Sequence, residues 1–135
     1  MPINIGVLCS GEGLELAAII GAARDGRLPA EIKIVITDRD SSALALAREA
    51  GLYGSFVPRT AFHANRDGYE RRLIEVLKEA GAEALVLANF LRETGPVLEE
   101  AFTGRIINLD GLAPGELPEF LALKVRGCSL SLVGG

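Results

Sequence analysis

The segment INIGVLCSGEGLEL, residues 3–16, decides the fold class of this chain. Its first six residues form an apolar run, as expected for a strand buried in the middle of a sheet. Residues Ser10 to Gly13 then predict a tight turn, and a helix is expected from Leu14 to Arg24. A strand that passes through a glycine-rich turn into a helix is typical of a parallel α/β sheet.

Short apolar runs and amphipathic helices alternate along the rest of the chain. Residues 1–135 are therefore expected to form a single α/β domain. Its core would be a doubly wound, Rossmann-like, mostly parallel sheet with helices on both faces. The clearest helix is expected over Arg66–Ala80, because Tyr69, Leu73, Val76 and Leu77 share one face. Further strands are predicted at Ile32–Thr37, Ser55–Val57, Ala84–Ala88, Arg105–Asn108 and Ser129–Val133, and further helices over 42–50, 96–102 and 119–126.

Composition excludes several classes of partner. The net charge is −4 and the Lys and Arg residues are scattered, so there is no basic stripe for nucleic acid or an anionic membrane. No apolar run approaches the ~18 residues that a membrane span needs. Cys9 and Cys128 lie in apolar runs, without metal spacing or a disulfide framework. Because the N-terminus lacks the features of a signal peptide, we expect a cytoplasmic protein.

The predicted sheet also predicts where a ligand binds. In open α/β sheets, ligands bind beyond the carboxyl ends of the strands, where the strand order reverses. Four segments directly follow predicted strands, and we expect them to surround a crevice for a small molecule. They are Ser10–Gly13, Asp38–Asp40, Asn89–Arg92 and Asn108–Asp110.

The first of these segments has two glycines of a dinucleotide-binding fingerprint, but Leu16 stands where the third would be. Glu12 and Glu15 lie in or just before the first helical turn. Carboxylates there complement the helix dipole, whereas beside a phosphate they would repel it. The sequence therefore favours a structural role for this loop, with a nucleotide-binding module as an alternative.

Several stretches match a known family in order and spacing: Ile5–Gly13, Ala47–Gly51, Tyr69–Leu73, Leu85–Pro96 and Gly104–Asn108. On these residues the chain resembles the glycinamide ribonucleotide (phosphoribosylglycinamide) formyltransferase family, as a shortened and divergent member with the formyltransferase N-terminal fold. The resemblance implies a role in purine biosynthesis, with transfer of a formyl group from 10-formyltetrahydrofolate to the amine of a ribonucleotide. It also implies that Ser10, Gly11, Glu12 and Gly13 bind substrate and that Asn89 and Arg92 bind the folate.

The same resemblance brings out three departures from the family. Asn108 matches a catalytic Asn, but Asp110 stands where the family has His. The reaction builds an oxyanion and moves a proton, which an imidazole can assist. An aspartate, with a reference pKa of about 3.9, would be ionised and would repel the oxyanion. Leu14 and Glu15 replace the Ser and Asn of the family's phosphate loop, and the sequence stops near Val133, before the segment expected to carry the family's catalytic Asp.

These departures predict a formyltransferase-like domain that is catalytically inactive and acts as a binding or partner module. An alternative is weak or altered formyl or one-carbon transfer by Asn108 and a protonated Asp110. His63 is expected to be an exposed loop residue, and Asp38 with Asp40 a solvated turn rather than a metal site. The predicted strand after Cys128 would leave an unpaired sheet edge, which favours a homodimer.

Overall fold

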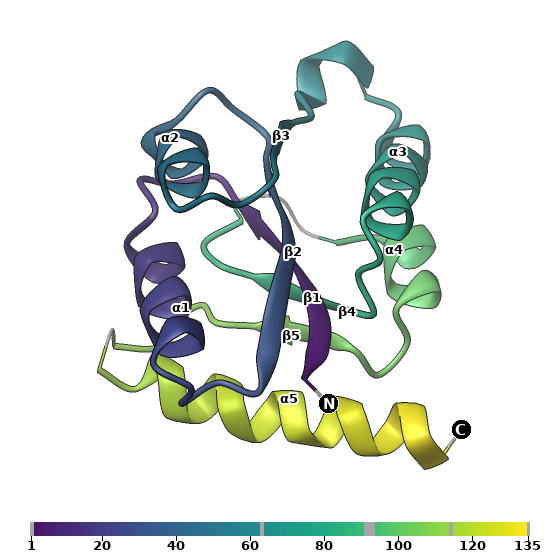
Figure 1. Cartoon of the computed structure of the whole chain (residues 1–135). Helices are drawn as coiled ribbons and strands as arrows, with labels where there is room; N and C mark the ends of the chain where they lie inside the picture. The colour runs from purple at the N-terminus through teal and green to yellow at the C-terminus, as the bar shows by residue number, and fades with distance from the viewer. Residues whose placement is uncertain (1, 63, 91–93, 114, 135) are drawn as a thin grey trace.

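Five strands form one parallel sheet in the order β3-β2-β1-β4-β5 (Figure 1). The structure, a computed structural model, describes residues 2–62, 64–90, 94–113 and 115–134, with the backbone alone for 129–134. The order reverses between β1 and β4, so the predicted doubly wound topology is confirmed. The strands are β1 (Ile3–Cys9), β2 (Ala30–Thr37), β3 (Gly54–Phe56), β4 (Ala84–Leu87) and β5 (Ile106–Asn108).

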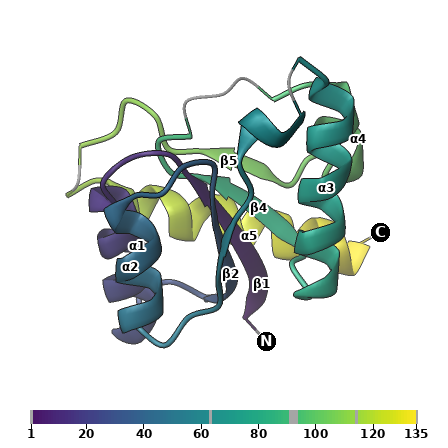
Figure 2. The same ribbon diagram turned by 90° about the horizontal axis from the view of Figure 1, so that it is seen from above.

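Helices cover both faces of the sheet (Figure 2). One face packs against α1 (Leu14–Arg24), α2 (Ser42–Glu49) and α5 (Leu117–Gly134). The other face packs against α3 (Arg66–Glu79) and α4 (Pro96–Ala101), and a 3-10 helix, η1 (Arg59–Phe62), precedes α3. Two apolar cores therefore lie on opposite sides of β1, as a central, doubly covered strand requires.

The periodicity expected for α3 is confirmed, because Tyr69, Leu73, Val76 and Leu77 are all buried. The side chain of Asn65 caps the helix, its Oδ1 accepting the N–H of Gly68 over 3.0 Å. At the start of α2, neither Ser41 nor Ser42 caps the helix with its side chain. Ser41 occupies the N-cap without a side-chain hydrogen bond, and Ser42 instead donates to the carbonyl of Glu12 over 2.9 Å.

A β-bulge interrupts the pairing of β1 with β2. Ile5 pairs with Ile32 but Gly6 pairs with Ile34, so Lys33 is an extra residue on β2. The bulge shifts the alternation of side chains: Ile32 lies in the core with α1, whereas Ile34 lies in the core with α3. In a regular strand these two residues would share one face.

The predicted strand at Ser129–Val133 is wrong, because α5 continues through these residues as one helix. Leu117, Leu121, Val125 and Cys128 are buried at helical spacing, so packing on the sheet outweighs the local β preference of the final residues. The argument for a homodimer from an unpaired final strand therefore fails. No helix in the described ranges has the length and apolar composition needed to cross a bilayer.

Candidate functional site

Four loops line the carboxyl edge of the sheet, here meaning the ends of β2, β1, β4 and β5. Thr37 of β2 pairs with Cys9 of β1, and Leu87 of β4 pairs with Asn108 of β5. The segments expected at one crevice therefore follow one another along this edge. Their order is 38–40, 10–13, 89–90 and 108–110 in the described residues.

The loop after β1 is held from both sides. The backbone N–H of buried Ser10 donates to the carbonyl of Asn89 over 3.1 Å. Gly13 is the N-cap of α1 with φ 95°, and a Cβ there would lie 3.1 Å from Cα of Ala43. Glycine is therefore needed at this position for both its backbone angle and its close approach to α2.

Asn89 links two loops of the site. Its backbone has φ 61°, a left-handed conformation that asparagine tolerates better than most residues. A Cβ added to Gly11 would lie 2.5 Å from Nδ2 of Asn89, so the amide packs directly against that glycine. This contact gives Asn89 a structural role beside the folate contact that the resemblance implies. Arg92, the second implied folate residue, lies outside the described residues.

Asp38 is buried, contrary to the expectation of a solvated turn, whereas Asp40 is exposed. The carboxylate of Asp38 lies 3.4 Å from Nε of Arg39 and 3.2 Å from Nε of Arg59. Burial of a charge requires such partners, because desolvation of an isolated carboxylate is costly. In the described parts of the chain, no three His, Cys, Asp or Glu side chains form a group that could hold a metal ion.

Asn108 and Asp110, the proposed catalytic pair, are both exposed at the end of β5. The backbone N–H of Asp110 donates to Oδ1 of Asn108 over 2.9 Å. This hydrogen bond uses the amide oxygen of Asn108 as the acceptor. The NH₂ group of Asn108 takes no part in it and can still donate.

Two carboxylates lie close enough to the buried thiol of Cys9, at the end of β1, to affect its pKa. Burial, together with the smaller effect of the nearby charges of Glu15 and Asp38, raises the pKa of the Cys9 thiol from 9.0 to about 12. Both carboxylates thus act on one point at the start of the glycine-rich loop. A phosphate placed there would be repelled by Glu15, whereas the charge of Asp38 is paired with Arg39 and Arg59.

Sequence reasoning missed two residues near the site. Arg59 pairs with Asp38 from η1, and no local pattern signals this contact. Glu70 is buried on α3 and accepts the N–H groups of Gly95 over 2.5 Å and of Leu98 over 3.0 Å. It therefore caps α4, which follows the loop after β4. His63 lies outside the described residues.

Comparisons with known proteins agree with this architecture. A family model described as formyl transferase matches residues 3–128. The phosphoribosylglycinamide formyltransferase of Escherichia coli (strain K12) is 32% identical over 125 residues, which cover 92% of this chain and 57% of that protein. The chain thus spans little more than half the length of that relative.

Two solved structures show the same arrangement. Glycinamide ribonucleotide transformylase 1 from Symbiobacterium toebii superposes with a TM-score of 0.75 at 36% identity, over 79% of this chain and 50% of that one. Phosphoribosylglycinamide formyltransferase from Brucella melitensis gives a TM-score of 0.75 at 27% identity, over 93% and 68% of the two chains. These likenesses confirm the predicted fold class.

Proposed function

Because the chain belongs to the formyl transferase family, we propose that it keeps the family's crevice at the carboxyl edge but not its reaction. It would act as a binding module for a small molecule, or for a protein partner, in a cytoplasmic setting. The observation that carries this proposal is the exposed Asp110 beside Asn108, at the position where the resemblance implies an imidazole.

Formyl transfer needs groups that Asp110 does not supply in place of an imidazole. The tetrahedral intermediate carries an oxyanion, which needs hydrogen-bond donors or positive charge nearby. A proton must also leave the attacking amine. A carboxylate in solvent supplies negative charge where the oxyanion would form. The NH₂ group of Asn108 offers two N–H donors but no proton acceptor.

The loop after β1 supports the same proposal. Glu15 lies in the first turn of α1, and with Asp38 it contributes to the raised pKa of Cys9. A phosphorylated substrate would meet the charge of Glu15 where the resemblance places its phosphate. The crevice thus favours a ligand without a phosphate.

A turnover assay tests the loss of activity. The chain would be mixed with glycinamide ribonucleotide and 10-formyltetrahydrofolate, and formation of the formylated product would be followed. We expect no turnover above the uncatalysed background for the wild-type chain or for the matched control Asp40→Asn. Robust turnover would overturn the proposal. If Asp110→Asn abolished that turnover, the alternative function, formyl or one-carbon transfer by Asn108 and Asp110, would replace the proposed binding module.

A thermal-shift measurement tests the nucleotide-binding alternative. Purine nucleotides would be added to the wild-type chain and to the variant in which both Glu12 and Glu15 become Gln. We expect no shift in either form. A shift that grows in the neutralised variant would establish phosphate binding at Ser10–Gly13 and contradict our assignment of the loop.

A further inference from the structure

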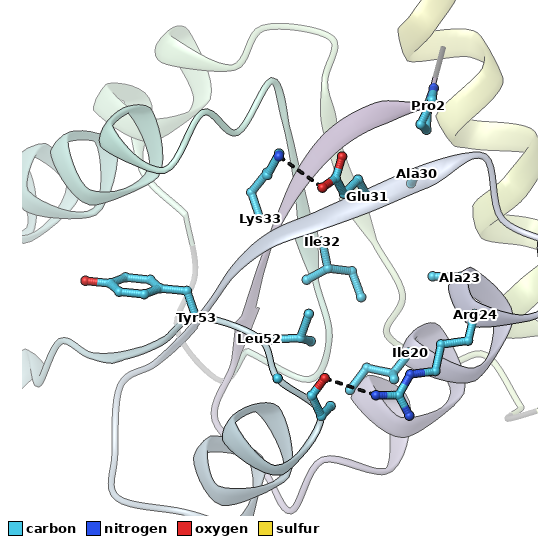
Figure 3. Close-up of a pocket in the computed structure, with 12 residues that line it drawn as sticks. Pro2, Ile20, Ala23, Arg24, Ala30, Glu31, Ile32, Lys33, Leu52 and Tyr53 are labelled. Atoms are coloured by element: carbon cyan, nitrogen blue, oxygen red, sulfur yellow. Dashed lines mark hydrogen bonds and ion pairs between the residues drawn. The ribbon is translucent and has the colours of Figure 1, made fainter.

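A cavity of 610 Å³ opens at the amino end of the strands, opposite the carboxyl edge (Figure 3). It is formed by the start of β2, the last turn of α1 and the connection from α2 to β3. Its volume falls within the ~300–1,000 Å³ typical of sites for small ligands. None of the residues proposed for the carboxyl edge lines it.

The lining has an apolar floor between two different walls. Ile20, Ile32 and Leu52 form the floor. Figure 3 shows the ring of Tyr53 on one side of these residues and the guanidinium of Arg24 on the other. Tyr53 is 67% exposed, so its ring is accessible to a ligand.

The polar groups of the lining are richer in donors than in acceptors. The Nη2 of Arg24 donates to the carbonyl of Ala50 over 3.0 Å, and the Nζ of Lys33 contacts Oε1 of Glu31 over 3.0 Å. A guanidinium carries five N–H donors and an ammonium three, so each cation retains donors beyond these contacts. Two cations and one carboxylate also leave the lining with an excess positive charge.

The bulge in β2 places one of these cations. Lys33 is the inserted residue, and its side chain projects into the lining of the cavity. Bulges redirect a side chain at the expense of regular pairing and are common beside functional sites. The hydrogen bond to Ala50 meanwhile fixes the guanidinium of Arg24 at the opposite wall.

We propose that this cavity binds a small organic anion with an apolar or aromatic body. The body would lie on Ile32 and Leu52, with Tyr53 at one end of the cavity, and its carboxylate or sulfonate group would pair with Arg24 at the other. Charge-assisted contact with a guanidinium gives the site its preference for an acid. The site is separate from the carboxyl edge and does not depend on the function proposed for it.

Fluorescence titration with two related probes tests this proposal. The anionic probe is 8-anilinonaphthalene-1-sulfonate, and N-phenyl-1-naphthylamine has the same ring system without the sulfonate. We expect saturable one-to-one binding of the anion by the folded wild-type chain. Binding of the neutral probe should be roughly tenfold weaker, as expected for loss of one charge-assisted contact.

Variants then locate the bound probe. Arg24→Met should weaken the anion about tenfold but leave the neutral probe unchanged, while Arg24→Lys should retain most of the affinity. Ala23→Leu should weaken both probes, because its side chain would fill part of the cavity. Leu123→Ala, at an exposed position on α5, is the control that should change neither.

Circular dichroism would confirm that each variant is folded, and Arg24→Gln would replace Arg24→Met if the latter is not. Absence of saturable binding by the wild-type chain would overturn the proposal. So would equal affinity for the two probes, or anion binding that survives both the charge-removing variant and Ala23→Leu. Loss of binding in Leu123→Ala would assign the probe to α5 and would overturn it as well.

Discussion

The carboxylate of Glu70 lies 2.5 Å from the backbone nitrogen of Gly95, although 25 residues separate them in the chain. Its second oxygen accepts the N–H of Leu98. One buried side chain thereby joins α3 to the start of α4 and satisfies two amides that have no partner within the helix.

Replacing Glu70 by Ala should lower the free energy of unfolding by about 2–4 kcal/mol, because two buried N–H groups lose their acceptor. Urea denaturation measures the change. Glu75→Gln is the matched control, since Glu75 makes an exposed ion pair with Arg72 and should cost less than about 0.5 kcal/mol. Equal losses in the two variants would show that Glu70 is not the cap.

The contact between Gly11 and Asn89 leads to a second prediction. Gly11→Ala should destabilise the chain by about 1–3 kcal/mol, because the new Cβ would press against the amide of Asn89. Asn89→Gly alone should cost little, since its φ of 61° suits glycine.

The double variant tests the cause. If the clash is responsible, adding Asn89→Gly should restore most of the stability lost in Gly11→Ala, as a double-mutant cycle by thermal denaturation would show. Gly115→Ala serves as the control, because a Cβ at that exposed glycine meets no atom within 4 Å. Additive losses would exclude the proposed contact.

The raised pKa of Cys9 predicts a loss of stability in alkali. The folded chain holds the thiol proton up to about pH 12, whereas the ordinary value is 9.0. The resulting stabilisation is fully present below pH 9 and is lost as the pH rises from 9 towards 12, with a slope approaching ~1.4 kcal/mol per pH unit. Urea titrations at several pH values across this range should show that the free energy of unfolding falls less steeply with pH for Cys9→Ala than for the wild-type chain. An equal dependence of the free energy of unfolding on pH in the two chains would contradict the raised pKa of Cys9.

The turn after β5 gives a fourth prediction. Asn108→Ala removes the acceptor of the Asp110 N–H and should cost about 0.5–1.5 kcal/mol, as measured by chemical denaturation. Asp110→Asn keeps the backbone donor and should leave stability within about 0.5 kcal/mol of the wild-type value. A larger loss in Asp110→Asn would mean that its side chain supports the turn.

Local patterns predicted most of the framework. The helix Leu14–Arg24 was found with the expected bounds, because a tight turn precedes it and its apolar residues repeat at helical spacing. The segment Ser129–Val133 was predicted as a strand from its local β preference, whereas its backbone continues a helix that begins at Leu117.

The candidate site was less predictable than the framework. The carboxyl ends of the strands follow from topology, so Ser10, Asn89 and Asn108 could be assigned to one edge. The partners of buried charges could not be predicted, because these contacts join residues far apart in the sequence. Arg59 pairs with Asp38, and Glu70 accepts the N–H of Gly95. The cavity at the amino end combines the ends of α1 and α2 with a bulge that no sequence pattern marks.

The bulge at Lys33 also bears on how this sheet tolerates changes in chain length. Elsewhere in a strand, removal of one residue would exchange the two faces and turn apolar side chains towards the wrong core. At Lys33 removal would leave Ile32 and Ile34 on the faces that they now occupy, because regular alternation assigns adjacent residues to opposite sides. Loss of this residue would therefore preserve both cores but change the wall of the cavity. The ligand preference of the cavity at the amino end of the strands can thus change without a change of fold.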